Sequence, residues 1–406
     1  MKKTLFCLVL LLLAAGCAPT VDPNLPTPTW AVNYPTAAPL PGELPPAAGG
    51  FTPQAPAGTF GAGEVAGLAF GPDGAAWLLL VDGALRWDGS AWQATPLHDG
   101  LLVGLDGRGW LWATPLDGRS LFAWDGAAWR VFGPPSGWAP VEDFVLIPVP
   151  QGLETDPDGV LWLSTAQDVR RFDGQTWQVY PQADWGLPES ESFDYKPILS
   201  LALDSGGAPW VGVCDWGGPG PLSGRALRRL EGGNWIDPGL PLERPCVTAL
   251  AAGKDGALWV GVEQSLWRFS AGEWSELALP QPEDLPADRR PGYISRVWLD
   301  GLGQPWVSAT LCGESSCDNG QVLFAWQGGE WRQQSRVSAT ETWTLLFDRG
   351  GAAWLFSPAG VFRPRDGALA AVPGAPLPLA AAQDAQGAIW LVGSADGQTA
   401  LYRLGE

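Results

Sequence analysis

The chain has 406 residues, of which 46% are hydrophobic and 17% charged, and its formal net charge at pH 7 is −19. This apolar content is enough to fill a core and excludes wholesale disorder. A surface this acidic repels phosphate backbones and anionic lipid headgroups, which excludes a nucleic-acid partner.

The N-terminus has the order of an export signal. Lys2 and Lys3 give a positive start, residues 5–13 are almost wholly apolar, and small residues at 14–16 precede Cys17. This order is typical of a secretory signal peptide, and the apolar run is shorter than the roughly 20 residues of a membrane-spanning helix. We therefore predict that the chain is exported.

The residues before Cys17 resemble the bacterial lipobox, although Ala14 stands where leucine is more usual. The resemblance implies a signal peptide over residues 1–16, cleavage before Cys17 and a lipid on its sulfur. The alternative is an ordinary signal peptide with a chance cysteine. A second acyl chain, which the resemblance also implies, matters because one chain alone gives only marginal membrane binding. We expect the protein to be anchored to the bacterial membrane through Cys17, facing the extracytoplasmic side.

Residues 17–58 are rich in proline, which denies the segment a helix and regular ladder pairing. We predict a tether that extends by about 3 Å per residue where it is polyproline-like and that holds the body away from the membrane. One island within it, residues 29–34 (Thr-Trp-Ala-Val-Asn-Tyr), differs from the rest in composition.

Residues 59–406 contain internal repeats. Eight tryptophans each follow a glycine by three residues, at spacings from 35 (Trp77 to Trp112) to 50 (Trp112 to Trp162). An aspartate stands three residues before that glycine in six repeats and directly before it in two. The pairs are Gly74/Trp77, Gly109/Trp112, Gly159/Trp162, Gly207/Trp210, Gly256/Trp259, Gly303/Trp306, Gly351/Trp354 and Gly387/Trp390.

Each repeat predicts four short strands. The aspartate caps a tight turn and the glycine supplies a positive φ, between one apolar strand such as 247–251 and another such as 258–262. A third strand follows, as at 266–269, and a second glycine turn leads to a fourth that usually begins on tryptophan. A period of roughly 40–50 residues with four strands is typical of a β-propeller. We predict an all-β, eight-bladed β-propeller of four-stranded antiparallel blades with very little helix.

Two repeats show the motif fully: Asp255-Gly-Ala-Leu-Trp-Val-Gly-Val followed by Trp274, and Asp158-Gly-Val-Leu-Trp-Leu-Ser-Thr followed by Trp177. This motif is similar to the two-component regulator propeller repeat, and the similarity covers nearly all of residues 60–406. The resemblance implies an extracytoplasmic sensing module. Such modules usually precede a membrane span and a kinase, and neither follows Glu406. The resemblance therefore implies the fold and not direct signal relay.

The eighth repeat has no fourth strand after 400–404. An unpaired edge invites aggregation, and a strand from the other terminus would cover it. Residues 29–34 resemble the fourth strands of other blades, such as 177–180. We predict that residues 29–34 pair beside 399–404 and close the ring. In the alternative, the island is linker and residues 51–60, or nothing, close the ring.

Besides Cys17, the mature chain holds four cysteines, an even number that indicates disulfides in an exported protein. Cys214 ends the second strand of blade 4 and Cys246 begins the first strand of blade 5, on the same face of adjacent blades. Cys312 and Cys317 share one loop. We predict the disulfides Cys214–Cys246 and Cys312–Cys317. A four-thiolate metal site is the rival interpretation, which no C-x-x-C spacing supports.

Long insertions at 133–150, 181–197, 214–225, 278–293 and 311–320 join strands two and three or connect blades, and all fall on one face. Binding residues concentrate in such loops on rigid scaffolds. For any one of these residues, a solvated acidic loop is the alternative. The candidate ligand face comprises Asp184, Trp185, Glu189, Glu191, Asp194, Tyr195, Asp215, Trp216, Arg289, Arg290, Tyr293, Glu314 and Asp318.

Most of the 25 tryptophans occupy repeat positions, where a large ring fills the wedge between neighbouring sheets. Only tryptophans outside that register, such as Trp138, Trp185 and Trp216, are candidates for stacking on a carbohydrate.

The residues argue against an enzyme. His98 is the one histidine, which excludes multi-histidine metal sites and disfavours a Ser-His-Asp triad. We predict a monomeric binding or sensor-like propeller without metal or cofactor, which recognises a small ligand or a protein partner. The alternatives are a propeller lyase or hydrolase acting on an envelope or extracellular substrate, and a purely structural part.

Overall fold

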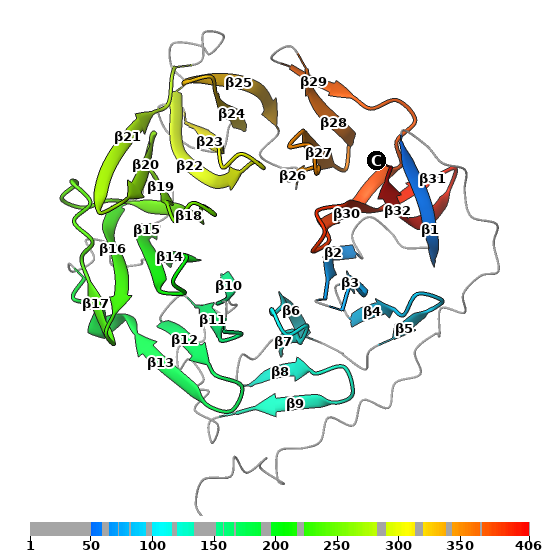
Figure 1. The fold of residues 1–406 in the computed structure, drawn as a ribbon, viewed down its shortest axis with the longest axis horizontal. Helices are drawn as coiled ribbons and strands as arrows, with labels where there is room; N and C mark the ends of the chain where they lie inside the picture. The colour runs from blue at the N-terminus through cyan, green and yellow to red at the C-terminus, as the bar shows by residue number, and fades with distance from the viewer. Residues whose placement is uncertain are drawn as a thin grey trace, which may run out of the picture.

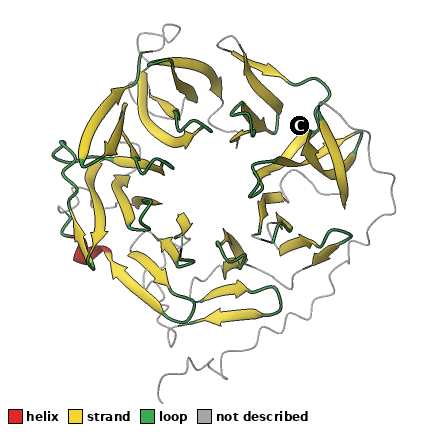
Figure 2. Cartoon of the chain, in the orientation of Figure 1, coloured by secondary structure: helices red, strands yellow, loops and turns green. Residues whose placement is uncertain are grey.

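The structure is a computed structural model that describes residues 50–58, 65–71, 73–80, 83–94, 100–115, 120–133, 152–156, 158–165, 168–187, 196–216, 223–281, 290–312, 320–337, 343–365 and 368–405. These residues form eight four-stranded antiparallel sheets arranged in a ring (Figure 1). The one helix in these ranges is the short 3-10 helix η2 (Gln182–Trp185), drawn red in Figure 2. The predicted eight-bladed, all-β propeller is confirmed.

In blades 1 to 7 the strands follow chain order from the centre outward. Blades 1 to 4 consist of β2 (Val65–Phe70), β3 (Ala76–Leu80), β4 (Gly83–Trp87) and β5 (Trp92–Ala94); β6 (Gly100–Leu105), β7 (Leu111–Pro115), β8 (Leu121–Trp124) and β9 (Trp129–Phe132); β10 (Gly152–Thr155), β11 (Leu161–Ser164), β12 (Asp168–Phe172) and β13 (Trp177–Pro181); and β14 (Lys196–Leu203), β15 (Pro209–Trp216), β16 (Ser223–Glu231) and β17 (Asn234–Ile236).

Blades 5 to 7 consist of β18 (Val247–Ala252), β19 (Leu258–Val262), β20 (Ser265–Ser270) and β21 (Glu273–Ala278); β22 (Arg290–Leu299), β23 (Pro305–Cys312), β24 (Gln321–Gln327) and β25 (Glu330–Val337); and β26 (Thr344–Phe347), β27 (Ala353–Ser357), β28 (Gly360–Arg365) and β29 (Ala368–Ala371). Blade 8 consists of β30 (Leu377–Gln383), β31 (Ile389–Ala395), β32 (Gln398–Leu404) and β1 (Phe51–Gly58).

Closure of the ring by an N-terminal segment is confirmed, but the predicted segment 29–34 is wrong. The strand that pairs with β32 is β1, with Phe51 opposite Leu404 and Gly58 opposite Thr399 (Figure 1). The Phe51 ring is fully buried and lies 5.9 Å from the ring of Trp354 in blade 7. Blade 8 therefore includes residues ahead of the predicted domain boundary at 59, and residues 29–34 lie outside the described residues.

The recurring aspartate caps its turn as predicted and also binds the repeat tryptophan. Asp106 Oδ1 accepts the backbone N–H groups of Arg108 and Trp110, each at 2.9 Å. Its Oδ2 accepts the indole N–H of Trp112 at 2.9 Å. Gly109 completes the turn with a φ of 81°, which a residue with a side chain rarely adopts. The same indole bond recurs in Asp204/Trp210, Asp348/Trp354 and Asp384/Trp390.

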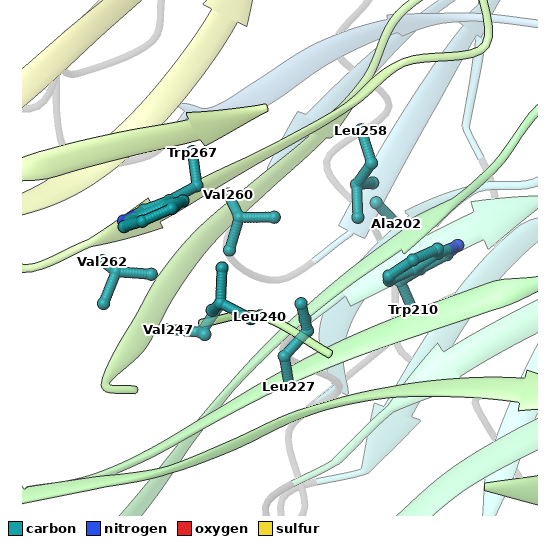
Figure 3. Packing of buried hydrophobic residues seen from close by; sticks show 9 residues of the cluster. All are labelled: Ala202, Trp210, Leu227, Leu240, Val247, Leu258, Val260, Val262 and Trp267. Carbon is teal, nitrogen blue, oxygen red and sulfur yellow. The ribbon is translucent and has the colours of Figure 1, made fainter. Parts of the chain in front are cut away.

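The repeat tryptophans pack between blades, as predicted. Trp77 contacts Leu111 of the next blade, and Trp112 contacts Leu161 in the same way. Figure 3 shows this packing between blades 4 and 5, where Trp210 faces Leu258. Each blade thereby buries an aromatic ring against its neighbour, which makes the scaffold a continuous core around the ring.

An arginine on the third strand lies over the repeat tryptophan in six blades. The pairs are Arg86/Trp77, Arg171/Trp162, Arg229/Trp210, Arg268/Trp259, Arg363/Trp354 and Arg403/Trp390, with Cζ 4.5–6.0 Å from the ring centroid. In blades 2 and 6 alanine stands there, and Arg130 and Arg332 occupy the paired position on the fourth strand. The arginine is thus part of the repeat's architecture.

The predicted disulfide Cys214–Cys246 is confirmed and joins blade 4 to blade 5. Cys312 is also disulfide-bonded, and its predicted partner Cys317 lies outside the described residues. Within the described ranges, no helix is long and apolar enough to cross a membrane.

Candidate functional site

The first region that could hold a ligand is the predicted long-loop face. In an antiparallel meander, the connections between strands two and three and between successive blades leave from one face, and the other turns leave from the opposite face. The strand order places the ends that flank all five long insertions on the same face. We call this the long-loop face and the opposite one the turn face.

Few of the predicted face residues can be placed. Asp184 is exposed in η2, and Tyr293 is half-buried in β22. The side chains of Asp215, Trp216 and Arg290 lie outside the described residues, as do Glu189, Glu191, Asp194, Tyr195, Arg289, Glu314 and Asp318 in full, and likewise Trp138.

Trp185 belongs to the core rather than to a surface. It is 1% exposed, and its ring lies 5.0 Å from that of Trp235. Arg228 donates hydrogen bonds to the carbonyl oxygens of Trp185 and Gly186, both at 2.8 Å. In this structure the ring is therefore covered and cannot stack on a carbohydrate.

The second region is a cavity of about 180 Å³ on the turn face between blades 1 and 2. It is lined by Asp73, Trp77, Arg86, Arg108, Gly109, Asp125 and Gly126. Its charged side chains are already paired within the chain, because Arg86 binds Asp73, Arg108 binds Asp106, and Arg130 binds Asp125. These groups maintain the repeat, so the cavity offers a ligand little unpaired charge.

The third region is the inner wall, which we define as the innermost strands of the eight blades: β2, β6, β10, β14, β18, β22, β26 and β30 (Figure 1). The turn after each innermost strand begins at the residue three positions before the repeat glycine, such as Asp106 before Gly109; we call it the turn residue. The residue two positions before it pairs directly with the repeat tryptophan, so both side chains lie on the same side of the sheet. Six blades carry a small or aliphatic residue there: Ala69, Gly104, Ala202, Ala251, Leu346 and Ala382.

Blade 3 carries Glu154 at this position, opposite Trp162. The residue is exposed, and its carboxylate has no hydrogen bond or ion pair with any described residue. The inner wall leaves the side chain open to water while protein surrounds it on the other sides. This partial desolvation raises the pKa of Glu154 to about 7, because the charged form loses hydration without gaining a partner.

Blade 6 carries Trp298 at the same position, opposite Trp306. Trp298 is half-buried, and its ring lies 5.1 Å from that of Trp343 in blade 7. Two residues earlier on β22, Arg296 is exposed, and its guanidinium donates a hydrogen bond to the Trp343 carbonyl oxygen at 3.4 Å. The innermost strands thus carry an acid in blade 3, without a partner among the described residues, and a cation beside an aromatic ring in blade 6.

Sequence reasoning missed these three residues, although a signal was available. Aligning the repeats on the turn residue shows a charged side chain at a position that is otherwise uncharged, at Glu154 and again at Arg296. Loop length, on which the predicted ligand face depends, carries no information about positions within the strands. Among the described residues, no group of three or more histidine, cysteine, aspartate or glutamate side chains comes together in a way that could hold a metal ion.

No protein-family model and no curated protein matches the sequence. Among solved structures, the propeller of Dos1 is 10% identical over 88% of this chain and 95% of its own, with a TM-score of 0.55. A virginiamycin B lyase from Staphylococcus aureus is 15% identical over 73% and 92%, with a TM-score of 0.45. The extracellular domain of the one component system BT4673 from B. thetaiotaomicron is 14% identical over 84% and 51%, with a TM-score of 0.42. At 10% identity the likeness to the Dos1 propeller shows the fold alone.

Proposed function

We propose that the chain is a membrane-anchored, extracytoplasmic binding propeller of the two-component regulator type, which recognises a small ligand or a protein partner without chemical change. One observation carries the proposal. The charged residues that recur from blade to blade bond to one another on the turn face, as in Arg229–Asp204 at 3.1 Å. The long connections, whose length differs from blade to blade, leave from the opposite face of the same closed ring.

This division of faces suits a binding protein. Apolar residues and the Cys214–Cys246 disulfide join blade 4 to blade 5, and the bond from the Trp210 indole to Asp204 fixes two strands within blade 4. A scaffold held in this way fixes the ends of each loop. The conformational entropy lost on binding is then mainly that of the loops, because the strands are already ordered.

A thermal-shift screen tests the binding function. The mature chain with Cys17→Ser would be heated with sugars, divalent cations, amines, peptides and peptidoglycan fragments. A ligand at a hundred times its dissociation constant adds about 2.7 kcal/mol to the free energy of unfolding. A reproducible rise in Tm supports small-ligand binding. Unchanged Tm values together with a specific crosslink on cells would indicate a protein partner. If no compound raises the Tm and no specific crosslink forms, the proposed binding function is wrong.

The anchor has a separate test. Wild-type chain should pellet with membranes and incorporate labelled fatty acid, whereas Cys17→Ser should remain in the supernatant and stay unlabelled. A Cys17→Ser variant that still pellets would contradict the lipid anchor.

A propeller lyase or hydrolase is the second candidate, and Glu154 is the observation that favours it. A carboxyl group with a pKa of about 7 is matched to proton transfer near neutral pH. Mass spectrometry of each ligand recovered from the thermal-shift screen separates the two functions, since a binding protein returns the ligand unchanged.

A further inference from the structure

We propose that the turn-face cavity between blades 1 and 2 binds the neutral amide group of a small ligand (Figure 1). The indole N–H of Trp77 and the guanidinium of Arg108 would donate to the amide oxygen, and the Asp73 carboxylate would accept the amide N–H. The cavity lies on the face opposite the long loops, so the inference goes beyond the proposed binding function and does not depend on it.

Blade 1 lacks the aspartate that binds the repeat tryptophan in four other blades. In blade 2, Asp106 is the turn residue, and its carboxylate accepts the indole N–H of Trp112 at 2.9 Å. In blade 1 the turn residue is Gly71, which has no side chain. The indole N–H of Trp77 therefore has no acceptor within the described ranges, although only 2% of this residue is exposed. A donor left in this way costs free energy, which a ligand that accepts its hydrogen bond would recover.

The Trp77 indole N–H is accessible, whereas its equivalent in blade 5 is not. Blade 5 has the same departure from the repeat, with Gly253 as its turn residue, and Trp259 Nε1 is enclosed by protein without an acceptor among the described residues. Trp77 lines the cavity, and its Nε1 is not one of the enclosed atoms. Across the cavity stands Gly126, where a Cβ atom would meet no other atom within 4 Å. Of these two blades, blade 1 alone offers its indole N–H to a ligand.

Two arginines bring further donors to the cavity. Arg108 donates from Nε and Nη2 to Asp106, and Arg86 donates from Nη2 to Asp73. A guanidinium has five N–H donors, so each arginine keeps N–H groups that no described residue accepts. The Arg108 guanidinium also lies over the Trp110 ring, with Cζ 4.5 Å from the ring centroid. These contacts fix its position before a ligand arrives.

The charges of the lining narrow the ligand. Two arginines and two aspartates line the cavity, so a cation would lie against guanidinium groups and an anion against carboxylates. The remaining donors favour a neutral ligand with a strong oxygen acceptor. Asp73 adds an acceptor, because its carboxylate is 53% exposed and uses two of about four lone pairs, on Ala75 and Arg86.

An amide group matches this set of partners. Its carbonyl oxygen accepts two hydrogen bonds, and its N–H lies on the neighbouring atom, where a carboxylate can accept it. The cavity of about 180 Å³ also suits a small group, since a water molecule occupies roughly 30 Å³ in the liquid. The site therefore has room for an amide and a few carbon atoms.

The experiment is NMR of the full chain, purified in detergent and labelled with ¹⁵N-tryptophan, with N-methylacetamide as the probe. The Trp77 indole signal is the one that disappears in Trp77→Phe. We expect N-methylacetamide to move this signal saturably. Saturation-transfer spectra of the probe should show binding to Trp77→Phe that is at least tenfold weaker. Trp259→Phe removes the enclosed indole N–H at the same position of blade 5, and this matched control should bind as wild type.

Related probes test the assigned chemistry. Acetate, methylammonium and glycerol should each bind at least tenfold more weakly than N-methylacetamide, and equal binding by any of them would overturn the choice of a neutral amide. N,N-dimethylacetamide keeps the carbonyl oxygen and lacks the N–H, so it should bind more weakly than N-methylacetamide. Asp73→Ala should abolish the difference between these two amides, and a difference that persists would contradict the role of Asp73.

Two results overturn the site itself: no saturable movement of any indole signal, or equal binding by Trp77→Phe and wild type. Far-ultraviolet circular dichroism checks that Trp77→Phe is folded. If it is not, Arg86→Lys identifies the Trp77 signal, because the guanidinium lies over that ring at 5.9 Å, and the wild-type titration then decides. A ligand from the thermal-shift screen that leaves the Trp77 signal unmoved would support the binding function independently of this site.

Discussion

On the turn face, Asp255 accepts the N–H of Ala257 and pairs with Arg268, and these bonds lower the pKa of the Asp255 carboxyl. On the inner wall, Glu154 has no such partners within the part of the chain that the structure describes, and desolvation raises its pKa. The two carboxylates belong to neighbouring parts of similar repeats. Their contrast teaches that a charge repeated in most blades is bonded within the fold, whereas Glu154, which breaks the repeat, has no bonding partner among the described residues.

The largest change in the free energy of unfolding is expected for a tryptophan that is buried between blades. Trp210→Ala removes a ring that is 1% exposed between blades 4 and 5 and should lower the free energy of unfolding by about 3–5 kcal/mol. Trp298→Ala, at the half-buried inner-wall position, should lower it by much less. Guanidinium unfolding followed by circular dichroism measures both. Equal losses of stability would contradict the distinction between the repeat tryptophan and the inner-wall position.

The turn-face aspartate should come next. Asp106→Ala leaves the indole N–H of the buried Trp112 and the guanidinium of Arg108 without their acceptor, which should cost about 3 kcal/mol. Asp106→Asn keeps a carbonyl oxygen for one set of bonds and should cost less. The same unfolding assay compares them, and an alanine variant as stable as wild type would remove the structural role assigned to the repeated acid.

A smaller loss of stability is expected when an arginine that lies over a repeat tryptophan is replaced. Arg268→Ala loses a partly exposed ion pair with Asp255 and a stack on Trp259, together about 1 kcal/mol. Arg296→Ala, which has no carboxylate partner among the described residues, should change stability by less than that. Thermal unfolding of the two variants at low salt sharpens the comparison, and a larger loss for Arg296→Ala would reverse it.

The effect at Glu154 has the opposite sign and should be the smallest, because the side chain is exposed and water screens its charge. Because the folded-state pKa of Glu154 is raised from 4.5 to about 7, folding favours its protonated form, and this group's contribution to stability is lost as the pH rises from about 4.5 through about 7. Glu154→Gln should therefore match wild type near pH 4 and be more stable at pH 8. The Tm at the two pH values, with Glu273→Gln as control, measures this. A glutamine variant that is less stable at pH 8 would mean that the carboxylate has a partner.

Much of this fold could be predicted because the repeat is local. The turn that joins two strands needs Asp106 as a cap and Gly109 at positive φ, and both lie within a few residues of Trp112. The Cys214–Cys246 disulfide followed from the strand positions that the same repeat assigns. Because the same strand–turn–strand pattern occurs eight times, few folds other than an eight-bladed propeller fit the sequence.

The closing strand could not be predicted in the same way. Pro53 and Pro56 argued against a strand, yet β1 is the outermost strand of its blade, where proline is tolerated, and the register shifts beside both prolines. What selects residues 51–58 is the burial of Phe51 against Trp354 and Phe356 of blade 7. That contact joins the two ends of the chain and leaves no local signal.

The sequence by itself determined the repeat, the number of blades and the turn chemistry, because each depends on residues close together in the chain. The tertiary structure alone decided which strand closes the ring, that Trp185 is buried, and that Glu154 and Arg296 have no ion-pair partner among the described residues. The physical reason is that burial and pairing depend on neighbours contributed by other blades, and the neighbours of one strand are set only when the ring closes.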